Sequence, residues 1–223
     1  MKKIINFLQN RKYELLLVAL IQHLFIGIFI NELSFYTTVI WPINMFILGV
    51  LSIGVFIKKG RWKNIARNIL FIIVLGLPIG LTLFRDIPHY FQALNMMYVL
   101  YFMFIFWEVM LFLIKPGYIN TDIISAAACG YFLLIEIGVF LFQFIHYSNP
   151  LSFKGISNGD PANTYMDLVY FCSITMTSIG YGDITPNLHI AKLLTSIYGI
   201  AGQFYSVVLV GIIISKFTSN SEK

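Results

Sequence analysis

Six long apolar runs that carry almost no charge limit what this chain can fold into. They occupy residues 15–31, 33–57, 68–84, 88–114, 123–147 and 193–215. Because a membrane-spanning helix needs about 20 mostly apolar residues, each run can cross a bilayer. Only 11% of the residues are charged, against about 25% in an average soluble domain, which argues against a water-soluble enzyme. We therefore predict an all-α membrane protein with six transmembrane helices.

The basic residues predict how these spans are oriented. Most of them lie in two patches that flank apolar runs, namely Lys2, Lys3, Arg11 and Lys12, then Lys58, Lys59, Arg61, Lys63 and Arg67. Lys and Arg collect in cytoplasmic loops, so we expect both patches and both termini to be cytoplasmic, in a plasma membrane or a bacterial inner membrane. Charge placed in this way gives no indication of nucleic-acid binding. The first run lacks a small-residue cleavage site and is followed by further spans, which favours a true span over a signal peptide.

One segment between the fifth and sixth runs breaks the pattern. Residues 168–182 are apolar, too short to cross a bilayer, and end in Gly-Tyr-Gly. A stretch of this length is more often re-entrant or buried than spanning. The preceding residues 148–162 are polar and rich in Gly and Pro, which predicts an exposed loop.

A short helix is expected to enter this segment. Asn163 or Thr164 is the candidate N-cap, and Asp167 suits a first helical turn. The helix must stop at Gly180. We therefore expect a re-entrant helix followed by a non-helical strip of backbone.

The glycines of this strip indicate its chemistry. Gly180 and Gly182 tolerate positive φ, so that successive residues can alternate in handedness and turn their carbonyls the same way. Non-helical backbone at membrane depth is tolerated only when it is buried in protein or lines a watery path. Repeated around a symmetry axis, such strips form oxygen cages for a dehydrated monovalent cation. The Tyr181 ring is expected to point away from that axis and brace the strip against the short helix.

In these residues the chain resembles the tetrameric potassium channels of the voltage-gated-like and two-span bacterial types. The family pattern Thr-Val-Gly-Tyr-Gly-Asp corresponds to residues 178–183, and both flanks, 175–177 and 184–186, are common in the family. The resemblance extends over residues 121–218. It implies K⁺ sites formed by Ser178, Ile179, Gly180 and Tyr181, within a selectivity filter that also includes Thr177, Gly182 and Asp183.

The resemblance also marks three supporting positions. Tyr170 and Phe171 stand where the family often has a Trp pair in the pore helix, which bears on how firmly the filter is held. Ile174 replaces the acid that some two-span members place behind the filter. Gly202 falls where the inner helix often has a hinge glycine, although small residues also serve helix packing.

Ionisable residues inside the spans are candidates for modulation. Glu108 and Glu136 are expected to be protonated, or hydrogen-bonded to Asn95, Gln143 or backbone. His23 is expected to bond within the first four spans, while His146 and His189 near the outer mouth could make a current pH-sensitive. Cys129 and Cys172 are expected to be buried free thiols. No catalytic set, metal-ligand spacing or cofactor motif emerges.

These observations predict two domains, a four-span region over residues 1–115 and a pore domain over residues 116–223. We expect a homotetramer that conducts K⁺ passively, because one pore loop supplies only a quarter of each oxygen ring. Residues 87–114 contain no Arg or Lys, so steep voltage gating is not expected. Membrane lipids and an unknown modulator of the first four spans are the other expected partners. The alternatives are a weakly selective cation channel and a non-conducting subunit that scaffolds a partner.

Overall fold

The computed structural model describes residues 9–30, 32–56, 60–84, 89–114, 121–157 and 159–221, without the side chains of residues 77–84 and 212–221. The long helices are α2 (Lys12–Phe25), α4 (Trp41–Phe56), α5 (Arg61–Phe84), α6 (Tyr90–Leu113), α7 (Thr121–Ser148), α8 (Pro161–Met176) and α9 (His189–Ser221). The short elements are η1 (Ile26–Phe29), α3 (Leu33–Phe35), η2 (Tyr36–Ile40), η3 (Pro150–Ser152), β1 (Phe153–Lys154) and β2 (Thr185–Pro186). The all-α prediction is therefore confirmed for the described residues.

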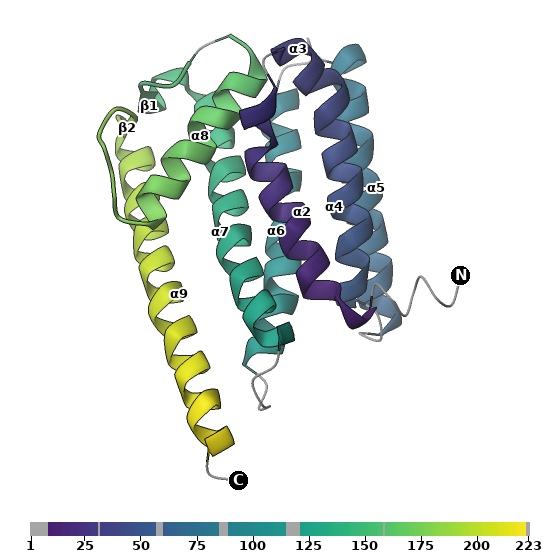
Figure 1. Ribbon diagram of the computed structural model, residues 1–223. Coiled ribbons are helices and arrows are strands. Elements are labelled where there is room, and N and C mark those ends of the chain that lie inside the picture. Colours follow the sequence, from purple (N-terminus) through teal and green to yellow (C-terminus); the bar gives the residue numbers. More distant parts are fainter. Residues whose placement is uncertain are drawn as a thin grey trace.

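The helices form a bundle with one edge helix and one oblique helix (Figure 1). α2 packs against α4 and α7, and α6 packs along α7. α7 therefore joins the N-terminal helices to the rest of the chain. α8 runs obliquely across the upper half of the molecule toward α9, which lies at the edge (Figure 1). In the described part of the chain, one side of α9 is therefore left without a covering helix.

Five helical segments in the described part of the chain are long and apolar enough to cross a membrane. They are Lys12–Phe29, Leu33–Phe56, Tyr90–Leu113, Thr121–Ser148 and His189–Gly211. The remaining expected span corresponds to α5, whose side chains are described only as far as residue 76. The chain is a membrane protein by these helices, and the sixth span remains a prediction.

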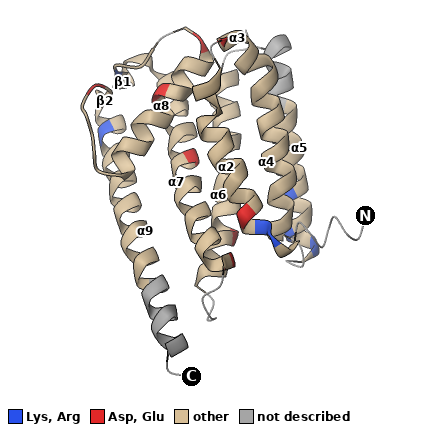
Figure 2. Cartoon of the chain, viewed as in Figure 1, with Lys and Arg blue, Asp and Glu red and all other residues tan. Residues whose placement is uncertain are grey.

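α5 begins at Arg61 rather than at residue 68, so three basic residues expected in a cytoplasmic loop, Arg61, Lys63 and Arg67, are helical instead. Arg and Lys are good helix formers, and their long stems let the charged ends reach toward water from a helix end. The described basic residues of α2 and α5 gather at the lower end of the molecule, where α9 also ends (Figure 2). The other residues of the predicted basic patches, Lys2, Lys3, Lys58 and Lys59, lie outside the described residues.

Tyrosines on α9 pack over glycines on α7. A Cβ at Gly130 would lie 2.1 Å from the Tyr205 hydroxyl, and one at Gly138 would lie 2.4 Å from the Tyr198 ring. The Tyr205 hydroxyl also donates to the Ala127 carbonyl at 2.7 Å. Small residues thus let the two helices approach closely, which fixes α9 relative to α7.

Candidate functional site

The oblique helix α8 begins at a different cap from the predicted one. Asp160, rather than Asn163 or Thr164, is the N-cap, and its carboxylate accepts the Ala162 amide at 2.8 Å. The reason is Pro161, whose fixed φ and missing N–H suit the first helical position. Asp167 lies beyond the first turn, where it accepts the Ser157 amide at 2.7 Å.

α8 ends at Met176, before the predicted stop at Gly180. The Ser178 amide donates to the Thr175 carbonyl at 3.1 Å, and the Ile179 amide donates to the Ile174 carbonyl at 2.9 Å. The Gly180 amide also turns back to Ile174, at 3.3 Å. In a planar trans peptide the preceding carbonyl points opposite to the amide N–H. These peptide carbonyls are therefore directed away from the end of α8.

The non-helical strip that follows α8 consists of residues 178–183, and its backbone handedness alternates along the chain. φ is +59° at Ser178, +53° at Gly180 and +84° at Gly182, whereas Ile179 and Tyr181 between them are not in the positive region. This is the alternation that the two glycines predicted. Ser178 was not predicted to take part, because a residue with a Cβ rarely adopts positive φ.

The outer end of the strip is clamped to α8 by Tyr170. Its hydroxyl donates to Asp183 Oδ2 at 2.6 Å, and its ring stacks on Tyr181 with centroids 6.4 Å apart and planes 1° from parallel. This hydrogen bond lowers the pKa of Asp183 and raises that of Tyr170 to about 12. Tyr170 thus makes a polar and a ring contact to the strip, although the family often has Trp at this position.

Phe171 and Ile174 support α8 from its other side. The buried Phe171 ring packs against Phe142 on α7 and Phe153 on β1, with centroids 5.7 Å and 5.6 Å away. Ile174 is also buried, and its carbonyl receives the two strip amides described above. Of the expected aromatic pair, only Tyr170 contacts the strip.

The loop before α8 is less exposed than predicted. Ser152, Phe153 and Ile156 are all buried. β1 pairs antiparallel with β2, with Phe153 opposite Pro186 and Lys154 opposite Thr185. Gly155, with φ of +86°, sits where a Cβ would lie 2.2 Å from the Asp183 carbonyl oxygen. This loop is folded because its aromatic residue packs against α7 and α8.

The inner end of the strip contacts Gln203 of α9, a residue that sequence reasoning missed. Its amide nitrogen donates to Ser178 Oγ at 2.5 Å and to the Met176 carbonyl at 3.3 Å. These groups border a concave surface formed by Ser178, Thr195, Gly199, Ile200, Gln203 and Phe204. Gln203 is the one carboxamide side chain in the uncharged sixth run, and this is the signal that could have found it.

Gly202 packs against the end of α8. A Cβ there would lie 3.0 Å from Met176 Cγ, and α9 is one continuous helix through this position. The contact is the one expected of a packing residue, and whether Gly202 is also a hinge stays a prediction.

The two buried glutamates have other partners than expected. Glu108 on α6 pairs with Lys63 on α5. Glu136 on α7 lies with its Oε1 2.6 Å from His23 Nδ1, so His23 does not bond within the first four spans. Tertiary contact between segments far apart in sequence decides both pairings, and periodicity does not reveal it.

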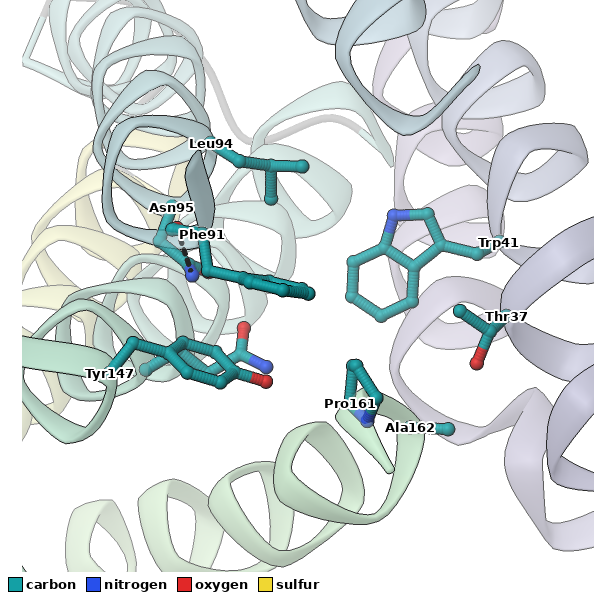
Figure 3. A pocket seen from close by; sticks show the side chains of 9 residues that line it. Thr37, Trp41, Phe91, Leu94, Asn95, Tyr147, Pro161 and Ala162 are labelled. Carbon is teal, nitrogen blue, oxygen red and sulfur yellow. Dashed lines mark hydrogen bonds between the residues drawn. The ribbon is translucent and has the colours of Figure 1, made fainter. Parts of the chain in front are cut away.

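Asn95 and Gln143, the partners expected for the glutamates, instead line a small pocket between α6, η2, α7 and the start of α8 (Figure 3). The Asn95 amide donates to the Phe91 carbonyl at 2.7 Å, within its own helix (Figure 3). Aromatic and apolar side chains, including Trp41 and Leu94, form the rest of the wall.

The remaining candidates are dispersed. His146 is buried near the end of α7, and His189 lies at the first residue of α9. Cys129 and Cys172 are buried free thiols, as predicted. Within the described residues no group of His, Cys, Asp or Glu could hold a metal ion.

Comparison with known proteins relates this region to channels. Residues 130–219 match the family model described as "Ion channel". These residues comprise most of α7, all of α8, the strip and nearly all of α9. The match covers the region in which Tyr170, Asp183 and Gln203 meet the strip.

Curated potassium channels match this chain over part of its length. "Two pore potassium channel a" of rice (Oryza sativa subsp. japonica) is 32% identical over 83 residues, which is 36% of this chain and 22% of the relative. "Two-pore potassium channel 5" of Arabidopsis thaliana is 29% identical over 102 residues, which is 44% and 22%. The chain thus covers 22% of each of these relatives. No solved structure gives a significant match. These similarities indicate a channel rather than an enzyme.

Proposed function

We propose that this chain is the subunit of a homotetrameric, potassium-selective channel that conducts K⁺ passively. The observation that carries the proposal is the alternating backbone of the strip, with left-handed φ at Ser178, Gly180 and Gly182. Carbonyl oxygens aligned in this way can replace the hydration shell of a monovalent cation. The permeant ions are the ligands, and no cofactor is needed.

The end of α8 supports a cation site next to the strip. The C-terminal end of a helix carries a partial negative charge from its unpaired carbonyls. α8 ends at Met176, and Ser178, the innermost proposed ligand, follows two residues later. The helix therefore favours a cation at the inner mouth of the proposed filter.

Assembly into a tetramer is supported by the uncovered face of α9. Apolar side chains there recur every three or four residues and are each more than half exposed, namely Ile190, Leu193, Ile197, Ile200, Phe204 and Val207. Such a stripe is the seam by which a helix meets other helices. Four copies would place four strips around one axis, with both termini on the cytoplasmic side of the plasma membrane.

Two alternatives remain in the proposal. A weakly selective cation channel would share the fold but lack a rigid filter, which the Tyr170–Asp183 clamp argues against. A non-conducting subunit would need a partner to form a pore. The intact alternation of the strip favours conduction by this chain itself.

The test is flux from the purified full-length chain in liposomes, with K⁺ and Na⁺ gradients measured in parallel. Potassium flux well above sodium flux supports the proposal. Equal fluxes would indicate the weakly selective channel, and no flux would indicate the non-conducting subunit. Cross-linking before solubilisation separates a tetramer from other assemblies.

A further inference from the structure

A buried polar cluster joins the first span to the proposed pore helix. His23 on α2, Glu136 on α7 and Tyr165 on α8 have side chains exposed by 1%, 0% and 0%. His23 Nδ1 lies 2.6 Å from Glu136 Oε1 and 3.0 Å from the Tyr165 hydroxyl oxygen. We call these three residues the His23 cluster. It connects segments that are more than a hundred residues apart in the chain.

The surroundings of the cluster contain titratable groups but no described cation. Trp41, Phe102 and Phe140 place their rings within 6.4 Å of the His23 ring centroid. The titratable side chains that face Glu136 or Tyr165 from the neighbouring elements are Tyr36 on η2, Tyr98 on α6, Cys172 on α8 and Tyr198 on α9. Among the described ion pairs, that of Glu136 is with His23 alone. The charge state of the cluster is therefore decided by its own protons.

One number of bound protons makes the buried His23–Glu136 pair electrically neutral. A neutral His23 that carries its proton on Nε2, beside an ionised Glu136, would have no proton between Nδ1 and Oε1 and would leave a net negative charge in an apolar interior, which is costly. One more proton makes the pair neutral overall, as a carboxylic acid donating to Nδ1 or as an imidazolium beside a carboxylate. Both neutral arrangements place that proton between Nδ1 and Oε1. The other atoms, His23 Nε2 and Glu136 Oε2, have no hydrogen-bond partner among the described residues.

Tyr165 conveys the state of this proton to α8. When Nδ1 is protonated, the Tyr165 hydroxyl must donate elsewhere, and the His23 carbonyl lies 3.5 Å away. The Tyr165 ring is held edge-on by Trp41, with centroids 4.5 Å apart. Tyr165 lies in the second turn of α8, which ends at Met176 directly before the strip. A change at Tyr165 therefore acts on a rigid helix that carries the proposed filter at its other end.

We propose that His23 and Glu136 are positioning residues for the pore helix, and that they share one buried proton whose gain or loss changes how often the pore conducts. This inference rests on the proposed function and assigns a role to the first span. The first four spans would then regulate the pore through a buried hydrogen bond rather than through a charge ladder.

The experiment records single channels of the full-length chain in lipid bilayers across a pH series, with thermal melting in detergent measured alongside. The variants are His23→Gln, Glu136→Gln and Tyr165→Phe. Glu108→Gln is the matched control for Glu136→Gln, since Glu108 is the other buried span glutamate and pairs with Lys63. Tyr98→Phe is the matched control for Tyr165→Phe, since Tyr98 bonds Trp41 instead.

In the wild type we expect open probability to change about fivefold or more across the series, as is typical of coupled sites. His23→Gln and Glu136→Gln should abolish this pH dependence, and both controls should keep it. Tyr165→Phe should make open probability independent of pH while melting still depends on pH, because the proton remains and only its link to α8 is lost. Ion selectivity should not change.

A wild type that passes K⁺ with the same open probability at every pH would overturn this inference and leave the proposed function standing. So would a Tyr165→Phe variant that keeps the wild-type pH profile, even if the other two variants fail to fold. A wild type without any potassium flux would overturn both proposals.

Discussion

Polar side chains form hydrogen bonds inside the bundle in the first four spans, whereas around the strip they form hydrogen bonds at the surface. In the first four spans the Lys63–Glu108 pair and the Trp41–Tyr98 hydrogen bond satisfy polar groups inside the bundle. Around the strip, Tyr170, Ser178 and Gln203 form hydrogen bonds at an exposed surface. The first region satisfies these polar groups internally, whereas the second presents them at a surface, as the proposed filter and tetramer require.

The strongest test of this contrast is Gly182→Ala. Gly182 has φ of +84°, where a Cβ costs about 1–2 kcal/mol and the strip has no other way to keep its alternation. We expect selective potassium current to disappear. Gly76→Ala in α5 is the control, because open space surrounds that position, and it should conduct normally. Potassium-over-sodium preference that survives in Gly182→Ala would remove the carbonyl-filter assignment.

Tyr170→Phe should have the next largest effect. It removes the hydroxyl bonded to Asp183 but keeps the ring that stacks on Tyr181, so conducting periods should shorten several-fold in single-channel records. Tyr131→Phe, on α7, is the control. Equal open times in the two variants would show that the clamp does not hold the filter.

The same bond predicts an acid response. Donation by Tyr170 lowers the pKa of Asp183 below its ordinary value of 3.8. The hydrogen bond from Tyr170 to the ionised carboxylate is therefore present above pH 3.8 and is lost only as pH falls through the lowered pKa. Tyr170→Phe removes the largest cause of the shift. Its current should therefore fail at a higher external pH than the wild-type current. Coinciding acid titrations of the two proteins would contradict this.

Gln203→Leu should have a smaller effect at the inner mouth. It removes the donor to Ser178 Oγ, and we expect a reduced potassium-over-sodium permeability ratio with retained conduction. Ser196→Ala is the matched control, because its hydroxyl borders the same concave surface but donates to Lys192 in its own helix. Equal ratios for both variants would leave Gln203 as a packing residue.

Gly202→Ala should act on stability more than on conduction. Its Cβ would lie 3.0 Å from the flexible Met176 side chain, and overpacking of this kind costs about 1–3 kcal/mol. We expect a lower melting temperature of the assembly, with Gly211→Ala, which faces open space, as the unaffected control. A changed open probability without a change in melting would favour the hinge.

The smallest effect expected is that of voltage. Within α6, from Tyr90 to Leu113, the one charged residue is Glu108, and it is paired with Lys63. Steep gating takes about three to four charges per subunit, each worth ~2.3 kcal/mol per 100 mV. The conductance–voltage curve in symmetric K⁺ should be shallow. A steep sigmoid would show that the first four spans sense the field.

The positive φ of the two glycines in the strip could be predicted from the sequence. The hydrogen bonds that Tyr170 and Gln203 donate to the strip could not. Gly180, Tyr181 and Gly182 form a short motif whose residue types dictate their backbone. Ser178 adopts positive φ because its neighbours hold it there, which its own propensity opposes.

Contacts between distant helices were also beyond the sequence. The apolar runs predicted the helices and approximate span limits, but not the rotation of each helix about its axis. That rotation decides whether Glu136 faces His23 on another helix, and the position of Gln143 in the same helix does not indicate it. The cap of α8, by contrast, could have been predicted from the sequence, because Pro161 after Asp160 favours that position over Asn163.

The loop before α8 offers two glycines with opposite prospects for protein engineering. At Gly155 any side chain would clash with the Asp183 carbonyl oxygen, so an epitope tag inserted there would disturb the proposed filter. At Gly159 nothing lies within 4 Å of where a Cβ would be. An antibody epitope or fluorophore attached next to Gly159 should therefore leave the pairing of β1 with β2 in place, and labelling of intact cells at this position would test the proposed orientation of the chain.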